Sequence, residues 1–220
     1  MPEETRTPKV LSKDIFQSTI DCEKSKWVNV VKITYKNQLG KDATWESAER
    51  TTRPPGVEID GVGIIAVLEG EKDEPARILL QKQFRPPVGR MCIEVPAGLI
   101  DAGETPEECA LRELQEETGY YGQIVKTEDG MERSCMMYND PGFCNTNLHF
   151  IHVKVDLMDP RNKKPEPKLE ENEFIECFTV PLRDMWQICR DLEKEGYAID
   201  ARVGTLAEGF EIMKKWSHIW

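Results

Sequence analysis

Residues 96–122, PAGLIDAGETPEECALRELQEETGYYG, concentrate carboxylates that could bind a metal ion. The segment contains six glutamates and one aspartate against a single arginine, so its net charge is −6. If the segment is helical, Glu113, Glu116 and Glu117 crowd one face. Like charges at this spacing repel by roughly 0.2–0.5 kcal/mol per pair, so we expect a group that offsets the repulsion.

The residues around this cluster predict a helix over 106–118. Thr105 is a suitable N-cap, and Glu108 completes a capping box with it. Pro106 suits the first helical position, and Gly119 suits the C-terminal end.

The two faces of this helix are predicted to differ. The inner, apolar stripe is expected to consist of Ala110, Leu111, Leu114 and Thr118. On the outer face, Glu113 and Glu117 are one turn apart, about 6 Å along the axis. Arg112 can reach Glu116 and also Glu108.

An acidic helix face has an ordinary interpretation, which is a solvated surface with salt bridges. The preceding loop favours a metal site, because Gly98, Gly103 and Glu104 come to the helix N-terminus and glycine permits close backbone approach. Mg²⁺ prefers one or two protein carboxylates together with water and substrate phosphates. A bound cation would also offset the repulsion between the glutamates.

The same residues resemble the conserved motif of the Nudix hydrolases, the Nudix box. Nine fixed or class-restricted positions over 23 residues are similar to that motif: Gly98, Glu104, Arg112, Glu113, Leu114, Glu116, Glu117, Gly119 and Tyr120. Tyr120 is an aromatic residue at a position where the family usually has a bulky aliphatic one.

This resemblance implies an α/β fold, a Nudix α/β/α sandwich with a mixed sheet, and hydrolysis of a diphosphate linked to another moiety. It implies Mg²⁺ as cofactor, with Mn²⁺ able to substitute. The implied metal ligands are Glu113, Glu117, the assisting Glu116 and the carbonyl oxygen of Ala97. Arg112 is implied to orient the glutamates. The positions with an implied structural role are Gly98, Glu104 and Gly119.

The flanking segments resemble ADP-ribose (ADP-sugar) pyrophosphatases of the eukaryotic type. They include KWVNV, TWESAERTTR, KQFRPPVGR, DPG and DAR, and they span most of residues 26–206. The resemblance implies attack of a metal-activated water on ADP-ribose, giving AMP and ribose 5-phosphate. Residues 126–139 look like an insertion in front of Asp140.

The subfamily resemblance also implies a substrate site. Trp27 and Trp45 match two tryptophans, one from each subunit of a swapped dimer, that sandwich the adenine. Stacking of a base on an aromatic ring is worth roughly 1–3 kcal/mol. The other implied substrate contacts are Glu46 to the adenine amino group, Arg50 and Arg85 to the diphosphate and sugar, Leu99 and Asp140. Strand aromatics in a core and surface salt bridges are the ordinary alternatives.

Residues 158–173 form a predicted loop that is long for a compact domain. In the subfamily a glutamate on a mobile loop outside the box is proposed as the general base, and it matches Glu173. Glu170, Glu171 and Glu176 are nearby alternatives, and a solvated acidic loop is the ordinary interpretation. Closure of the loop over bound substrate would complete the site.

The remaining pattern predicts a mixed sheet flanked by helices. Strands are expected near 26–36, 42–53, 62–69, 76–84, 91–98, 148–157 and 173–180, and helices near 182–195 and from Asp200 onward. The RPPG stretch at 53–56 interrupts the pattern. We therefore predict a β-rich dimerisation unit that carries the adenine clamp at 1–57 and a hydrolase domain at 58–220.

Composition limits the partners. The 220 residues carry a formal charge of −11, which argues against a nucleic-acid partner, and no apolar run reaches the ~20 residues of a membrane span. Seven scattered cysteines without a CxxC pair argue against zinc sites and disulfides. With no secretory signal, we expect a cytoplasmic protein, with the nucleus as the alternative. The expected partners are a nucleotide sugar and a second copy of the chain.

Three other functions compete with this interpretation. The first is a Nudix pyrophosphatase with another nucleoside diphosphate derivative as substrate. The second is a non-catalytic Nudix-like domain that senses a nucleotide, although every fixed position of the motif is filled here. The third is a phosphoinositide or nucleic-acid reader, which would need basic patches, whereas the Lys and Arg residues are dispersed.

Overall fold

The computed structural model describes residues 9–15, 26–70, 74–126 and 133–219. The chain divides into two compact units, one of Met1–Asp60 with Met136–Leu148 and the other of Gly61–Cys135 with His149–Trp220. The predicted boundary, after residue 57, lies close to this one, whereas Met136–Leu148 was not predicted to belong with the N-terminal unit. The predicted insertion at 126–139 lies partly outside the described residues.

The first unit is built on a three-stranded antiparallel sheet. Its strands, in spatial order, are β1 (Lys9–Ile15), β2 (Val28–Lys36) and β3 (Asp42–Arg50). The β2–β3 hairpin lies within the predicted strands at 26–36 and 42–53. Strand β1 was not predicted, because every residue of this strand is exposed and no apolar alternation marks it.

The second unit contains most of a mixed sheet of nine strands. Its longer strands are β4 (Gly61–Glu69), β5 (Arg77–Arg85), β6 (Arg90–Glu94), β10 (Asn147–Asp156) and β11 (Ile175–Pro181). The short strands are β7 (Ala97–Leu99), β8 (Gln123–Ile124), β9 (Met137–Tyr138, in the first unit) and β12 (Ala198–Ile199). The sheet is mixed because β12 runs parallel to β6, whereas β5 is antiparallel to β4, β6 and β11.

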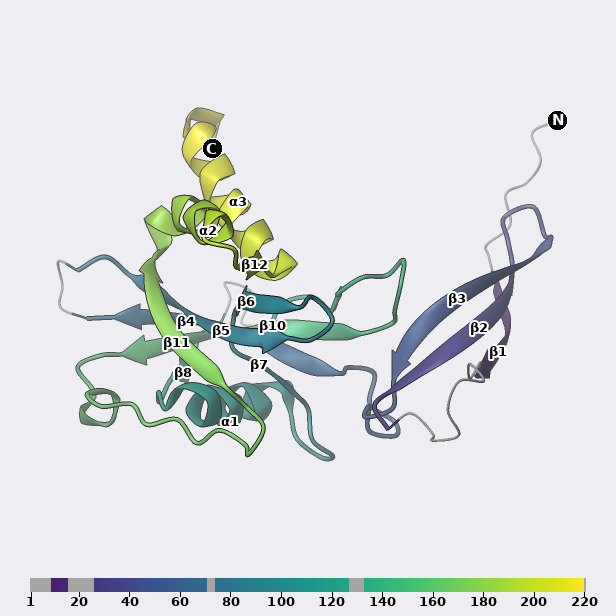
Figure 1. The fold of residues 1–220 in the computed structure, drawn as a ribbon, viewed down its shortest axis with the longest axis horizontal. Coiled ribbons are helices and arrows are strands. Elements are labelled where there is room, and N and C mark those ends of the chain that lie inside the picture. Colours follow the sequence, from purple (N-terminus) through teal and green to yellow (C-terminus); the bar gives the residue numbers. More distant parts are fainter. Residues whose placement is uncertain (1–8, 16–25, 71–73, 127–132, 220) are drawn as a thin grey trace. The chain divides into compact units, whose positions relative to one another are not determined.

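Helices cover both faces of this sheet (Figure 1). One face carries α1 (Pro106–Thr118), and the other carries α2 (Met185–Lys194) and α3 (Ala201–Lys215). Short 3₁₀ turns occur at Pro160–Asn162, Leu182–Asp184 and Ser217–Ile219. The predicted α/β class is therefore confirmed. No helix in the part of the chain that the structure describes is long and apolar enough to cross a membrane.

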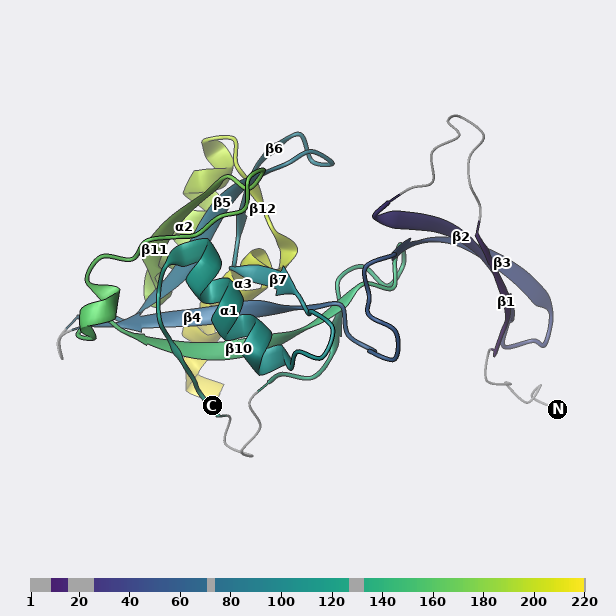
Figure 2. The same ribbon diagram turned by 90° about the horizontal axis from the view of Figure 1, so that it is seen from below.

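The strands alternate their side chains between the two helical layers. A buried cluster of Ile78, Leu80 and Ile93 packs with residues of α2 and α3. Leu79 and Gln81, their neighbours on β5, are also buried and therefore face the α1 side. Helix α1 itself packs against β4 and β7 (Figure 2).

One predicted strand, 91–98, is split in two. Val95 and Pro96 separate β6 from β7, since proline cannot donate to a ladder. The Pro96 carbonyl instead accepts a hydrogen bond from the Ile64 amide at 2.8 Å. The split turns β7 away from β6 and onto β4, where it can face α1.

Candidate metal and active site

Helix α1 begins and ends where the sequence predicts. The Thr105 hydroxyl accepts from the Glu108 amide, and the Glu108 carboxylate accepts from the Thr105 amide at 2.9 Å, which closes the capping box. Gly119 ends the helix with φ of 75°, a conformation that glycine adopts without strain. These caps fix the rotation of the helix and hence the direction of its glutamates.

The inner face of α1 differs from the predicted stripe. Ala110, Leu114 and Thr118 are buried as expected, but Leu111 is 36% exposed. Glu117 takes a place on the inner face and is only 3% exposed. A carboxylate thus occupies a position that an ordinary amphipathic helix would give to an apolar residue.

Strand β7, the glycine segment, can lie close to both β4 and α1 because Gly61 of β4 and Gly98 of β7 have no side chains. Gly61, Val62 and Gly63 of β4 pair with Leu99, Gly98 and Ala97 of β7 in antiparallel register. A Cβ on Gly61 would overlap the Gly98 carbonyl, and a Cβ on Gly98 would overlap the Glu113 carboxyl group. Gly98 therefore gives Glu113 the space in which its carboxylate lies.

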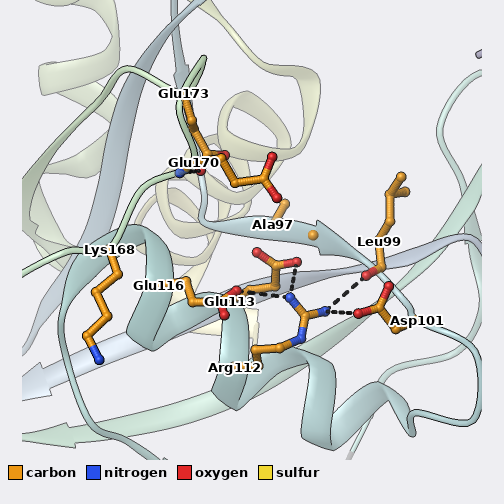
Figure 3. A pocket seen from close by; sticks show the side chains of 10 residues that line it. Ala97, Leu99, Asp101, Arg112, Glu113, Glu116, Lys168, Glu170 and Glu173 are labelled. Atoms are coloured by element: carbon orange, nitrogen blue, oxygen red, sulfur yellow. Dashed lines mark hydrogen bonds and ion pairs between the residues drawn. The ribbon is translucent and has the colours of Figure 1, made fainter.

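Arg112 holds the acidic cluster together (Figure 3). Its guanidinium donates to Glu104 at 2.8 and 2.9 Å, to Glu113 at 2.8 Å and to Glu116 at 3.1 Å. It also donates to the Leu99 carbonyl at 3.2 Å, which ties the helix to the glycine segment. The expected contact of Arg112 with Glu108 is wrong, because Glu108 is held in the capping box instead.

Burial perturbs the two inner glutamates strongly. Loss of solvent raises the pKa of Glu113 to about 7, although hydrogen bonds from Arg112 oppose the shift. Loss of solvent and the neighbouring Glu113 charge raise the pKa of Glu117 to about 8. The Glu117 carboxylate accepts one hydrogen bond, from the Ala97 amide at 3.1 Å. Ionisation of either glutamate therefore costs free energy in the folded protein, and a bound cation would offset that cost.

The long loop brings further carboxylates to the same place. Glu173 and Glu170 line a cavity of about 420 Å³ together with Ala97, Gly98, Leu99, Asp101, Arg112, Glu113, Glu116 and Lys168 (Figure 3). The charge of Glu173 contributes to the raised pKa of both Glu113 and Glu117. Of the other loop candidates, Glu171 does not line this cavity and Glu176 pairs with Lys82 at 2.8 Å.

The loop is anchored on the end of α1. The Lys168 amide donates to the Glu116 carbonyl at 2.7 Å, which satisfies one of the carbonyls left free at the helix C-terminus. A Cβ on Gly119 would overlap the backbone of Glu166. The anchoring contacts precede Glu170, so they fix the base of the segment that carries Glu173.

The residues present fit a divalent cation that shares its coordination with a substrate. Within the described residues, no group of three or more His, Cys, Asp or Glu side chains is placed to hold a metal ion. Glu113 and Glu117, with the Ala97 carbonyl nearby, instead provide the small number of oxygen ligands that Mg²⁺ prefers when water and phosphates complete its shell. In this structure the guanidinium of Arg112 binds Glu113 and Glu116 and so balances part of the negative charge of the cluster.

The partner of Arg85 was not predicted from the sequence. The guanidinium of Arg85 forms a fork with Glu94, with contacts at 2.6, 2.9 and 3.1 Å, and Glu94 is only 4% exposed. The sequence signal for this pair is Glu94 itself, because a carboxylate inside the apolar run CIEVP is expected to be buried and to need a cationic partner. Asp101 and Lys168 also line the cavity, and no sequence pattern marked either of them as a site residue.

The other predicted substrate residues, Trp27, Trp45, Glu46, Arg50 and Asp140, lie in the first unit. The indole of Trp45 donates to the Gly142 carbonyl at 3.0 Å, so the structure brings it to the turn that begins at Asp140. Trp27 and Trp45 are 58% and 52% exposed, and Glu46 and Arg50 are also exposed. The alternative of tryptophans packed in a core does not hold.

Trp27 and Trp45 stand far apart along one hairpin. Trp45 pairs with Ile33, six residues after Trp27. At 3.3–3.4 Å per residue the two indoles are separated by about 20 Å along the strand. One adenine therefore cannot stack between both rings of a single chain.

Comparisons with known proteins agree with this geometry. The family model described as the NUDIX domain matches residues 59–203. The chain is 48% identical over 211 residues to the ADP-ribose pyrophosphatase of Saccharomyces cerevisiae, covering 96% of this chain and 87% of the relative. It is 40% identical over 192 residues to the ADP-sugar pyrophosphatase of Mus musculus, covering 87% and 84%. A crystal structure of an ADP compounds hydrolase has the same fold, with a TM-score of 0.61 and 16% identity over 96% of this chain and 97% of the other.

Gly98→Ala should weaken cation binding by at least about tenfold, because the added methyl group displaces the Glu113 carboxylate. The measurement is the rise in melting temperature during an Mg²⁺ titration. Gly209→Ala is the control, since a Cβ there meets no atom within 4 Å. An unchanged Mg²⁺ response of Gly98→Ala would contradict the assignment of Glu113 to the metal site.

Glu117→Gln should stabilise the metal-free protein at pH 9 and not at pH 5. In the unfolded chain Glu117 ionises near pH 4.5, so its raised folded-state pKa of about 8 makes stability fall as the pH rises between these values. We expect the variant to melt at least several degrees above the wild type at pH 9 in chelator, because each kcal/mol corresponds to about 2–4 °C in a chain of this size.

The control for this comparison is Glu116→Gln, whose carboxylate is 46% exposed. Its melting temperature relative to the wild type should vary little between pH 5 and 9. A pH-independent difference for Glu117→Gln as well would show that burial of the Glu117 charge does not destabilise the fold.

Proposed function

The chain belongs to the Nudix family, and we propose that it hydrolyses the diphosphate of ADP-ribose, and of related ADP-sugars, to AMP and a sugar phosphate. The observation that carries this proposal is the pair Glu113 and Glu117, desolvated and one helical turn apart against the glycine segment. The identity with the yeast and mouse pyrophosphatases extends over most of the chain, which supports the same substrate class.

The proposed cofactor is Mg²⁺, with Mn²⁺ able to substitute. Glu113, Glu117 and the Ala97 carbonyl would hold it, with Glu116 assisting. When bound, the cation neutralises charge on the phosphoryl oxygens and lowers the pKa of water. The raised pKa values of Glu113 and Glu117 support this set, since burial removes much of the solvent that would otherwise stabilise their charge.

Glu173 is proposed as the general base. It would accept a proton from the attacking water while the water oxygen bonds to one phosphorus. The bond from that phosphorus to the bridging oxygen breaks, and the bridging oxygen leaves with the other phosphoryl group. The position of Glu173 in the cavity wall, next to Glu113, supports this role.

Three cations have proposed roles around the diphosphate. Arg112 keeps Glu113 and Glu116 in position through its guanidinium. Arg85 would meet the phosphate oxygens, and its fork with Glu94 presets its orientation. Arg50 is proposed to contact the diphosphate or the sugar.

The proposed adenine clamp needs two subunits. The rings of Trp27 and Trp45 are about 20 Å apart along one hairpin. Each adenine would therefore lie between Trp27 of one subunit and Trp45 of the other. Glu46 next to Trp45 would accept from the adenine amino group, and Asp140 would lie near the sugar.

A homodimer is further supported by apolar residues exposed on the first unit. Val10, Ile15, Val28 and Val30 are 59%, 62%, 43% and 46% exposed on a sheet of three strands. Val10 and Ile15 pair with Tyr35 and Val31 and so share a face that Val28 and Val30 do not, which leaves apolar side chains exposed on both faces of the sheet. Exposed apolar surface of this kind is typical of an interface. A second copy that pairs its own first unit with this one would cover it.

We expect the purified protein to convert ADP-ribose to AMP and ribose 5-phosphate only when Mg²⁺ is present, as product analysis by chromatography will detect. Glu173→Gln should lower kcat by about 100-fold or more, because it removes the general base. Glu171→Gln, which changes a neighbouring glutamate that does not line the cavity, should stay within about threefold of the wild type.

Two outcomes of that experiment would change the assignment. If Glu170→Gln rather than Glu173→Gln abolished turnover, Glu170 would be the base. If folded wild-type protein with Mg²⁺ left ADP-ribose intact but cleaved another nucleoside diphosphate derivative, the substrate proposal would be wrong and the Nudix chemistry would stand.

Mixing Trp27→Ala with Trp45→Ala protein should restore activity that each variant lacks alone. In a mixed dimer one clamp has lost both rings, while the other keeps Trp27 of one subunit and Trp45 of its partner. After subunit exchange, kcat/KM for ADP-ribose should rise several-fold above either variant, since stacking contributes roughly 1–3 kcal/mol per base. No recovery in a demonstrated mixed dimer would place both rings at separate sites.

A further inference from the structure

Gln81 is the most unusual polar residue in the core. It lies within β5 with 0% exposure, and neither its side-chain nitrogen nor its side-chain oxygen makes a hydrogen bond. A primary amide offers two hydrogens to donate and an acceptor oxygen, so Gln81 has hydrogen-bonding capacity that no well-formed hydrogen bond uses. A buried amide in this state destabilises the fold and therefore needs an explanation.

The position of Gln81 connects it to the metal-site helix. It shares the α1 side of β5 with Leu79, and it pairs across the sheet with Cys177 on β11 and Glu94 on β6. The Cys177 thiol donates to the Glu117 carbonyl at 3.6 Å. The Gln81 amide lies beside the Glu117 carboxylate and, as a weak hydrogen-bond donor, opposes the rise in the pKa of Glu117, but the geometry of the two groups falls short of a full hydrogen bond.

The Glu117 carboxylate can accept more hydrogen bonds than it receives, and the Gln81 amide can donate one. Its Oε2 accepts from the Ala97 amide, which leaves lone pairs on a carboxylate that is almost completely removed from solvent. Ligating carboxylates are themselves hydrogen-bonded by groups behind them, and those groups set the direction in which the ligand points. Gln81 stands behind Glu117, on the sheet side.

We propose that Gln81 is a positioning residue for the metal-binding carboxylate of Glu117. Its amide donates a hydrogen bond to Glu117 when that carboxylate binds a divalent cation, and this fixes the orientation of the ligand. The inference rests on the metal site of the proposed function. A leucine in this place would pack better in the core but would leave the carboxylate unsupported.

The ordinary explanation is a water molecule buried beside Gln81 that satisfies the amide without any role in metal binding. The two explanations differ in what removal of the amide does. Under the ordinary explanation, an apolar residue changes the stability of the metal-free and metal-bound protein equally. Under the proposal, it changes the affinity for the metal.

The test is an Mg²⁺ titration of melting temperature, at constant ionic strength, for full-length wild type, Gln81→Leu, Gln81→Met and Leu79→Met. For Gln81→Leu we expect a melting temperature in chelator at or above that of the wild type, because an unpaired amide is removed. The Mg²⁺ concentration for half-maximal stabilisation should rise roughly tenfold. Leu79→Met changes packing on the same face of β5 and should keep the wild-type Mg²⁺ dependence.

An Mg²⁺ dependence of Gln81→Leu equal to that of the wild type would overturn the proposal in favour of the buried water. Gln81→Met keeps an unbranched chain and carries the test if the leucine variant does not fold. Failure of both to fold would also overturn it, since an amide that only positions Glu117 is not required for folding. A wild type that Mg²⁺ does not stabilise would instead remove the metal site itself.

Discussion

The rest of the site depends on one electrostatic constraint, the burial of two like charges one helical turn apart. Glu113 and Glu117 lose solvent without gaining enough hydrogen bonds to replace it, and their pKa values rise to about 7 and about 8. Arg112 offsets part of this cost through its contacts with Glu113 and Glu116. The remaining cost makes the metal-free helix receptive to a cation, because a bound cation would replace the lost solvation.

The backbone around the helix follows from that constraint. A carboxylate can approach the β7 backbone only where no Cβ intervenes, so Gly98 faces Glu113 and Gly61 lets β4 pair closely with β7. The Glu108–Thr105 capping box and the left-handed Gly119 fix the helix rotation. The long loop is then tied to the helix end through Lys168, which brings Glu173 to the carboxylates.

Local chemistry was readable from the sequence, while the tertiary partners were not. Helix α1 was predicted to the residue because its caps lie within four residues of its ends. The predicted burial of Leu111 failed, because the sheet covers the side of the helix that holds Cys109 and Glu117 instead. The Arg85–Glu94 fork joins adjacent strands, and β1 has no apolar face, so neither produces a periodic pattern.

The core beneath the site is not optimised for stability. A buried carboxylate at Glu117 and an unpaired amide at Gln81 both destabilise the metal-free fold, and both lie between the sheet and α1. Apolar residues in their places would pack the layer as Leu79 and Leu114 do. A site that needs an oriented ligand in a dry environment cannot use such residues. A cation bound by Glu113 and Glu117 would offset part of the stability that this layer gives up.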